Sequence, residues 1–262
     1  MNENRILSLD GVHNFRDFGG YAVEGGGRVR RGLLWRSAEH AGASDTDLGV
    51  IAGLGLSVVA DLRGTSERSA RPCRRPAGFA AEVMFYDGET AQLGLHIEAA
   101  KGPLDADSAR AAMTGLYKVI AWRSSLLPTF RRYFGALAVQ DGASLVHCVA
   151  GKDRTGFAVA VLQHALGVHH DDIMADYLLT NADRNLESRI AALASASNAG
   201  GFYGTIDETA MRQLLGVQPA YLEAAFAAVA ERHGTIERYL AGVLGVGAKQ
   251  REVLRARFVE AR

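Results

Sequence analysis

A β-prone run, a polar loop and a small-residue helix follow one another without a break at residues 143–166. Ala143 to His147 (ASLVH) predicts a short strand, and Cys148 to Arg154 (CVAGKDR) predicts a loop. Thr155 to Leu166 (TGFAVAVLQHAL) then predicts a helix with an apolar face. Strand, polar loop and helix in this order form the anion-binding turns of α/β proteins. This unit therefore predicts an α/β fold with a site at the loop.

Other segments predict the strands and helices around this unit. Strand-like runs occur at Leu33–Trp35, Leu56–Leu62 and Ala81–Asp87. A cap residue, early acids and a glycine stop predict a helix from Ser44. Apolar residues at helical spacing predict helices over 108–120 and 125–139. Consecutive helices are expected over 171–194, 207–215 and 219–234. We expect a central, mostly parallel sheet flanked by helices, with a helical C-terminal half.

The chain has 262 residues, of which 48% are hydrophobic, and this size suits a single domain spanning residues 1–262. Residues 88–107 lack clear periodicity, so we expect a lid-like insertion within residues 88–121. Lys plus Arg and Asp plus Glu both number 29, which argues against a nucleic-acid partner held through bulk charge. Any attraction for anions must be local.

The N-terminal segment lacks the pattern of a signal peptide, and no apolar run reaches membrane-spanning length. The two cysteines, Cys73 and Cys148, indicate no disulfide framework and suit a reducing compartment. We therefore expect a soluble cytoplasmic protein without stable membrane insertion, and secretion without a cleaved signal is the alternative. Cys73, between arginines, is interpreted as an incidental exposed thiol.

The loop from Cys148 to Arg154 can close around a tetrahedral anion. Its backbone N–H groups form a nest, the next helix contributes its positive end, and Arg154 offers a planar fork for two phosphate oxygens. Gly151 permits backbone geometry that other residues resist. The same positive field favours the thiolate of Cys148 over the thiol. The loop therefore predicts thiolate attack on phosphorus, with no metal or organic cofactor.

The segment HCVAGKDRTG at residues 147–156 resembles the HC-x5-R-[ST] signature of the protein tyrosine phosphatase superfamily. Its Gly-Lys-Asp element, with NFRDFGGY, WRSAEH and DLR upstream, resembles a bacterial branch of tyrosine and lipid phosphatases. These landmarks span Asn14 to about Asn181. The resemblance implies a phosphomonoester hydrolase that forms a phosphocysteine intermediate and acts on phosphorylated proteins or phosphoinositides.

The resemblance also implies individual roles. Cys148 takes the nucleophile position, Arg154 binds the phosphate, and the Thr155 hydroxyl steadies the thiolate as it leaves. The phosphate-binding residues implied by the loop are Val149, Ala150, Gly151, Lys152, Asp153 and Arg154. Lys152 resembles a device of phosphoinositide phosphatases for substrates with more than one phosphate.

A general acid is also expected, because a departing alkoxide or phenolate gains from protonation. The resemblance assigns this role to Asp153, since the Trp-Pro-Asp loop of other superfamily members is absent from this sequence. Asp61, at the end of a predicted strand, competes for the role. Arg63 can instead hold Asp61 as a structural partner, so both residues are accessory candidates.

Two functions of other classes compete with the hydrolase. Sulfur transfer and arsenate reduction also place a reactive cysteine in a short anion-binding loop, although the positions of Arg154 and Thr155 fit them poorly. A non-catalytic module that binds a phosphorylated partner is the third interpretation. His147 is interpreted as a structural hydrogen-bonder next to the loop, and the NFRDFGGY segment as a glycine-rich structural turn in which Arg16 and Asp17 can pair locally.

Overall fold

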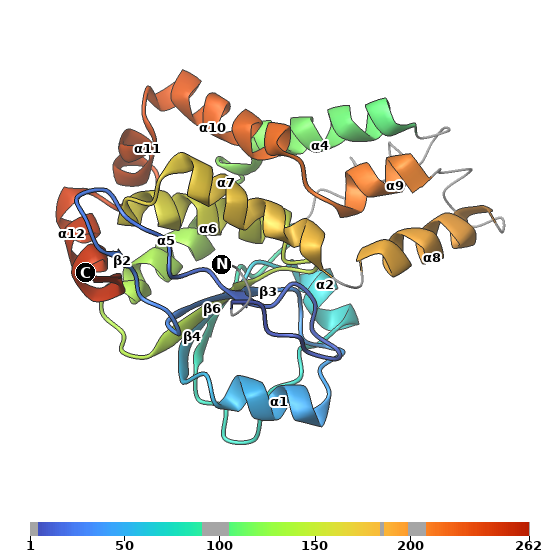
Figure 1. Ribbon diagram of the computed structural model, residues 1–262, viewed down its shortest axis with the longest axis horizontal. Helices are drawn as coiled ribbons and strands as arrows, with labels where there is room; N and C mark the ends of the chain where they lie inside the picture. The colour runs from blue at the N-terminus through green and yellow to red at the C-terminus, as the bar shows by residue number, and fades with distance from the viewer. Residues whose placement is uncertain (1–4, 91–104, 184–185, 199–207, 262) are drawn as a thin grey trace.

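In the computed structural model, the described residues are 5–90, 105–183, 186–198 and 208–261. A five-stranded sheet has the order β1 (Arg16–Asp17), β3 (Leu34–Ser37), β6 (Ala143–His147), β4 (Leu56–Asp61) and β5 (Glu82–Met84). β3, β6, β4 and β5 run parallel, and β1 is antiparallel to β3 (Figure 1). The expected mostly parallel sheet is therefore confirmed. A second pair joins β2 (Arg28–Val29) to β7 (Val259–Glu260).

Helices precede, join and follow these strands. They are α1 (Asp45–Ala52), α2 (Thr65–Ala70), α4 (Ala106–Ile120), α5 (Leu127–Leu137), α6 (Asp153–Leu166), α7 (His170–Leu178), the 3₁₀ turn η1 (Leu179–Ala182), α8 (Leu186–Asn198), α9 (Glu208–Leu215), α10 (Pro219–His233), α11 (Ile236–Gly242) and α12 (Ala248–Phe258). Ser44 caps α1 as expected, since its side chain accepts the N–H of Asp47 at 3.1 Å.

Two expected elements differ from the structure. The helical run from Asp171 is divided at η1, where the side chain of Asn181 bonds both the N–H and the carbonyl of Val217 at 2.9 and 2.8 Å. This anchor holds the turn against the segment before α10. The strand expected over residues 81–87 is shorter, and β5 pairs with β4 over three residues only.

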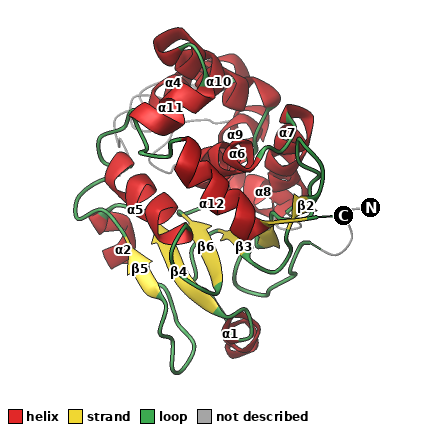
Figure 2. Cartoon of the chain, turned by 90° about the vertical axis from the view of Figure 1, so that its left-hand side faces the viewer, coloured by secondary structure: helices red, strands yellow, loops and turns green. Residues whose placement is uncertain are grey.

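The two faces of the sheet carry different layers. Alternating side chains of β4 place Val58 in the core shared with α5 and α6, and Val59 in the core shared with α1. Figures 1 and 2 show α1 on one face and the larger helical layer on the other. Within that layer, α6 is buried between the sheet and α7, α11 and α12. Its small residues, such as Gly156 and Ala160, suit this all-round burial.

Residues 91–104 of the expected lid-like insertion lie outside the described residues. The later part of that insertion forms α4, which packs against α9 and α10. Met113 and Tyr117 of α4 belong to the main hydrophobic core. Among the described helices, none has both the length and the apolar character that crossing a membrane would require.

Candidate active site

The loop after β6 lies at the carboxyl edge of the sheet. His147, the last residue of β6, is in register with Ser37 of β3 and with Asp61 of β4. Because these strands are parallel, the residues that follow them gather at one edge. Cys148 opens the loop there with 2% of its surface exposed, and α6 begins at Asp153. The predicted strand, loop and helix therefore form one continuous unit.

The carbonyl groups of this loop are bonded from behind. The carbonyl of Gly151 accepts hydrogen bonds from Asn14 Nδ2 at 2.8 Å and from Arg36 Nη2 at 2.9 Å. The N–H of Glu39 donates to the carbonyl of Val149 at 3.0 Å. Gly151 has φ +67°, and a Cβ there would lie 2.3 Å from the carbonyl oxygen of Ser37. The N-terminal segments expected to be structural thus hold the loop in shape.

A buried charge network lies behind the Gly151 carbonyl. Arg36 Nη1 lies 3.0 Å from one carboxylate oxygen of Asp176, and Arg16 Nε lies 3.5 Å from the other. All three side chains are at most 2% exposed. Burial, followed by the charge of Arg36, lowers the pKa of Arg16 to about 9, so Arg16 is still protonated at neutral pH. Two guanidinium groups and one carboxylate leave a net positive charge beside the loop.

The guanidinium of Arg154 is oriented by Glu67. Nη1 and Nη2 donate to the two carboxylate oxygens of Glu67 at 2.6 and 2.8 Å, and Nη1 also bonds Thr90 Oγ1 at 2.8 Å. Burial would lower the pKa of Arg154, but electrostatic interaction with Cys148 and the hydrogen bonds to Glu67 raise it above its ordinary value. Nε has no acceptor among the described residues, so the edge formed by Nε and Nη2 can still receive an anion.

Lys152 and Asp153 face the helical layer. Lys152 Nζ donates to the carbonyls of Leu214 at 2.5 Å and Gly216 at 3.1 Å, and lies 3.3 Å from Asp153 Oδ1. The same Asp153 oxygen accepts the Tyr117 hydroxyl at 2.9 Å. Lys152 is only 5% exposed, whereas the side chain of Asp153 is 21% exposed. The Lys152 ammonium is therefore occupied by backbone carbonyls, and Asp153 is reachable.

Thr155 lies in the first turn of α6, immediately after Arg154. Its side chain is fully buried, and its hydroxyl oxygen has no hydrogen-bond partner within the part of the chain that the structure describes. Burying a hydroxyl without a hydrogen-bond partner costs free energy. A hydrogen bond that forms only during function would give the Thr155 hydroxyl a reason to be there.

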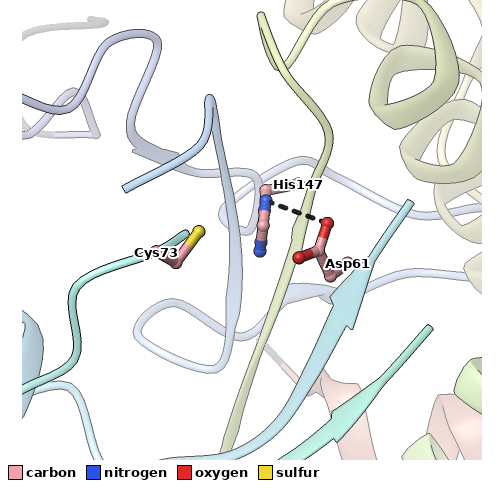
Figure 3. Close-up of side chains that lie close together, drawn as sticks. All are labelled: Asp61, Cys73 and His147. Carbon is pink, nitrogen blue, oxygen red and sulfur yellow. Dashed lines mark ion pairs between the residues drawn. The ribbon is translucent and has the colours of Figure 1, made fainter. Parts of the chain in front are cut away.

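Asp61 lies on the face of the sheet that packs against α1, with one carboxylate oxygen 3.8 Å from His147 Nδ1 (Figure 3). Arg63 donates to both of its carboxylate oxygens, from Nε at 2.9 Å and from Nη2 at 2.7 Å. Burial would raise the pKa of Asp61, but His147 and Arg63 lower it to about 2. Because burial lowers the pKa of His147 to about 4, Arg63 is the charged partner at neutral pH.

Cys73 completes this cluster and is half-buried, which corrects the expectation of an exposed thiol. Its sulfur accepts hydrogen bonds from Arg63 Nη2 at 3.0 Å and from the N–H of His40 at 3.3 Å. Burial raises the pKa of the Cys73 thiol. Ligand atoms of Asp61, Cys73 and His147 lie within 4.8 Å of one another. A metal ion fits poorly there, because the Arg63 guanidinium already bonds two of the three residues.

Sequence reasoning missed Glu67, Thr90 and Tyr117. Glu67 follows the DLR segment and is 87 positions from Arg154, so no local spacing links the two. Thr90 and Tyr117 belong to no motif, and only the fold brings them to the loop. The one available signal for Glu67 was its place just beyond a strand that delivers polar groups to the ligand-binding edge.

Comparisons with known proteins identify related chains. The model of a family described as the tyrosine phosphatase family matches residues 7–260. A putative tyrosine-protein phosphatase of Cupriavidus necator is 36% identical over 248 residues, which cover 93% of this chain and 86% of the relative. The triple specificity protein phosphatase of Mycobacterium tuberculosis is 30% identical over 260 residues, which cover 90% of this chain and 92% of the relative.

Replacing Asp176 with Asn should destabilise the fold, because Arg16 and Arg36 would remain buried without their carboxylate. We expect the free energy of unfolding in urea to fall by about 3–5 kcal/mol. Asp171→Asn, an exposed change on the same helix, is the matched control and should leave the unfolding midpoint nearly unchanged. Equal midpoints for the two variants would contradict this account of the network.

Gly151→Ala should distort the loop for two reasons, the positive φ and the approach of its Cβ to the Ser37 carbonyl. Gly245→Ala is the control for φ alone, because Gly245 has φ +76° and nothing within 4 Å of its Cβ position. We expect Gly245→Ala to cost about 1–2 kcal/mol and Gly151→Ala clearly more. Urea unfolding of both variants measures the difference, and a smaller loss for Gly151→Ala would show that the loop adapts easily.

Proposed function

Because this chain belongs to the tyrosine phosphatase family, we propose that it hydrolyses phosphomonoesters through a covalent intermediate on Cys148. The observation that carries the proposal is the loop between β6 and α6, whose carbonyls are bonded from behind by Asn14, Arg36 and Glu39. A loop held in this way can turn its amide N–H groups toward a bound anion. The whole chain would then form one catalytic domain.

Phosphate binding combines the loop amides with Arg154. The amides belong to Val149, Ala150, Gly151, Lys152, Asp153 and Arg154. Arg154 contributes the edge formed by Nε and Nη2, while Glu67 occupies its other edge. Two parallel N–H donors match two oxygens of a phosphate, so the guanidinium can follow the charge that develops on those oxygens during transfer.

The nucleophile is the thiolate of Cys148. The net positive charge of the network around Asp176, the N-terminus of α6 and Arg154 all favour the thiolate over the thiol. Sulfur attacks phosphorus as the bond to the leaving oxygen breaks, which gives phosphocysteine and the free hydroxyl product. Water then attacks phosphorus, inorganic phosphate leaves, and the Thr155 hydroxyl donates to the released thiolate.

Asp153 is the acid that protonates the leaving oxygen and the base that later takes a proton from water. It adjoins Arg154, its carboxyl is partly exposed, and the Tyr117 hydroxyl holds one oxygen at 2.9 Å. Asp61 suits the role poorly, since its buried carboxyl is bonded at both oxygens by Arg63 and has a pKa of about 2. The accessory pair Asp61 and Arg63 therefore supports the strand end.

The substrates are phosphotyrosine proteins, which the family match supports, and phosphoinositides are the second class. The name of the mycobacterial relative assigns it triple specificity, which favours a site that accepts more than one kind of phosphate ester. The neutral net charge of the chain argues against nucleic acid as the substrate. The competing sulfurtransferase and arsenate reductase chemistries would leave the geometry of Arg154 and Thr155 without a use.

Cys148→Ser should lower kcat for p-nitrophenyl phosphate, assayed with a metal chelator present, by more than about 10³-fold. The variant loses the thiolate but keeps the loop amides and Arg154, so binding of inorganic phosphate should persist. Cys73→Ser is the matched control and should retain activity within about threefold, since the change is remote from the reacting atoms. Comparable activity of wild type and Cys148→Ser would refute the covalent mechanism. A persulfide on Cys148 after thiosulfate treatment would favour sulfur transfer instead.

Asp153→Asn should slow the hydrolysis of poor leaving groups more than that of good ones. We expect a loss of about 10²–10⁴-fold in kcat for phenyl phosphate, and a much smaller loss for p-nitrophenyl phosphate, whose phenolate needs little protonation. Asp61→Asn, the matched control, should lower stability without changing the ratio of the two rates. If Asp61→Asn alone changed that ratio, the acid would have to be reassigned.

A further inference from the structure

A basic cleft of about 340 Å³ lies where the C-terminal ends of α4 and α10 meet, two helices that pack side by side (Figure 1). Its lining residues are Val119, Trp122, Arg123, Ser124 and Arg232. Two of these carry guanidinium groups and none carries a carboxylate. The cleft is therefore a concave, positively charged surface, in a chain whose formal net charge is zero.

Arg123 differs from the other arginines near the active site. Arg36, Arg63 and Arg154 each form an ion pair with a carboxylate at 3.0 Å or less. The half-buried side chain of Arg123 has no hydrogen bond or ion pair with any residue that the structure describes. A half-buried guanidinium without an anion has lost part of its hydration and gained nothing in return. An external anion would supply the missing partner.

Arg232 is held at the other side of this cleft by aromatic contacts. Its guanidinium carbon lies 4.3 Å from the centroid of the Trp122 ring. The Trp122 ring is itself fixed, because it stacks on His233 and its Nε1 donates to His233 Nε2 at 3.4 Å. A cation–π contact uses the face of a guanidinium and leaves its N–H edge free for an anion.

The position of Arg123 couples this cleft to the catalytic loop. Burial, followed by the positive charge of Arg154, lowers the pKa of Arg123, whereas Glu67 and Asp153 act in the opposite direction. The guanidinium therefore lies within electrostatic reach of the phosphate clamp and of the proposed acid. A substrate anion bound near Arg123 would also relieve its repulsion with Arg154.

Lys152 was the residue expected to bind an additional phosphate, but its ammonium is bonded to the carbonyls of Leu214 and Gly216. Using it for substrate would first break two charge-assisted hydrogen bonds. Arg123 has no such bonds to lose. The electrostatic cost of recruiting a second cation is therefore lower for Arg123 than for Lys152.

We propose that Arg123, assisted by Arg232, binds a second phosphate group of the substrate while the Cys148 loop holds the phosphate to be hydrolysed. This inference rests on the proposed function. It implies that the preferred substrates of the protein are small molecules or headgroups with two or more phosphates, such as phosphorylated inositols. Two guanidinium-bearing residues that line one cleft suit a phosphate dianion better than a single carboxylate, which needs only one guanidinium.

The test compares kcat/KM for soluble short-chain phosphatidylinositol monophosphate and bisphosphate. Arg123→Met should lower kcat/KM for the bisphosphate about tenfold more than for the monophosphate, since it loses charged hydrogen bonds only with the former. Arg123→Lys should restore part of the difference, and Arg232→Met should show a smaller selective loss. Lys118→Met removes one exposed charge near the end of α4, five positions before Arg123, and is the matched control. It should leave the ratio of the two substrates unchanged.

Equal losses on both lipids after Arg123→Met would overturn the proposal, because they would show a general electrostatic effect. A selective loss with Lys152→Met but not with Arg123→Met would overturn it as well. If Arg123→Met lowered kcat/KM selectively only for phosphotyrosine peptides with acidic flanking residues, the proposal would also be overturned. Arg123 would then bind a carboxylate of the substrate and not a second phosphate.

A binding measurement separates this inference from the proposed catalytic function. In the Cys148→Ser background, calorimetry with soluble inositol bisphosphate should show about tenfold weaker binding after Arg123→Met. This result is expected even if the covalent mechanism were wrong. Unchanged affinity would overturn the inference, and activity of Cys148→Ser equal to that of wild type would overturn only the mechanism.

Discussion

The conformation of the loop from Cys148 to Arg154 depends on the two ion pairs that Asp176 forms with Arg16 and Arg36. The Asp176 carboxylate lies between Arg16 and Arg36, and Arg36 in turn bonds the Gly151 carbonyl at 2.9 Å. Burying three charged groups is costly, and their mutual attraction offsets this cost only in good geometry. The network therefore ties β1, β3 and α7 together in one arrangement. The same arrangement leaves a surplus positive charge where the proposed mechanism places an anionic nucleophile and substrate.

The alternation of side chains along β6 separates two polar systems. His147 faces the α1 side, where Asp61 and Arg63 neutralise each other and Cys73 is bonded as a thiol. The next residue, Cys148, belongs to the core on the α6 side. Two cysteines in one chain thus have different surroundings. One has a hydrogen-bonded site on an apolar face, and the other faces a helix N-terminus and an arginine.

The sequence predicted the elements whose signals are local. The strand, loop and helix at residues 143–166, the cap of α1 at Ser44 and the parallel sheet are confirmed. The partners of the loop were not predictable in the same way. Glu67 reaches Arg154 across 87 positions and Tyr117 reaches Asp153 across 36, so only tertiary packing brings them together. Lys152 is a further example. The motif predicted a lysine beside the phosphate site, but not that the carbonyls of Leu214 and Gly216 bond its ammonium.

The bonds from Lys152 to Leu214 and Gly216 link the loop to the last turn of α9 and to the segment that joins it to α10. If that segment moved away from the loop, the buried ammonium of Lys152 would lose these two acceptors. The position of the segment and the conformation of the loop are therefore thermodynamically coupled. An anion that competes for the ammonium would loosen the outer helices, and a ligand that displaced those helices would alter anion affinity by the same factor. Residues remote from the chemistry can therefore tune turnover without contacting substrate.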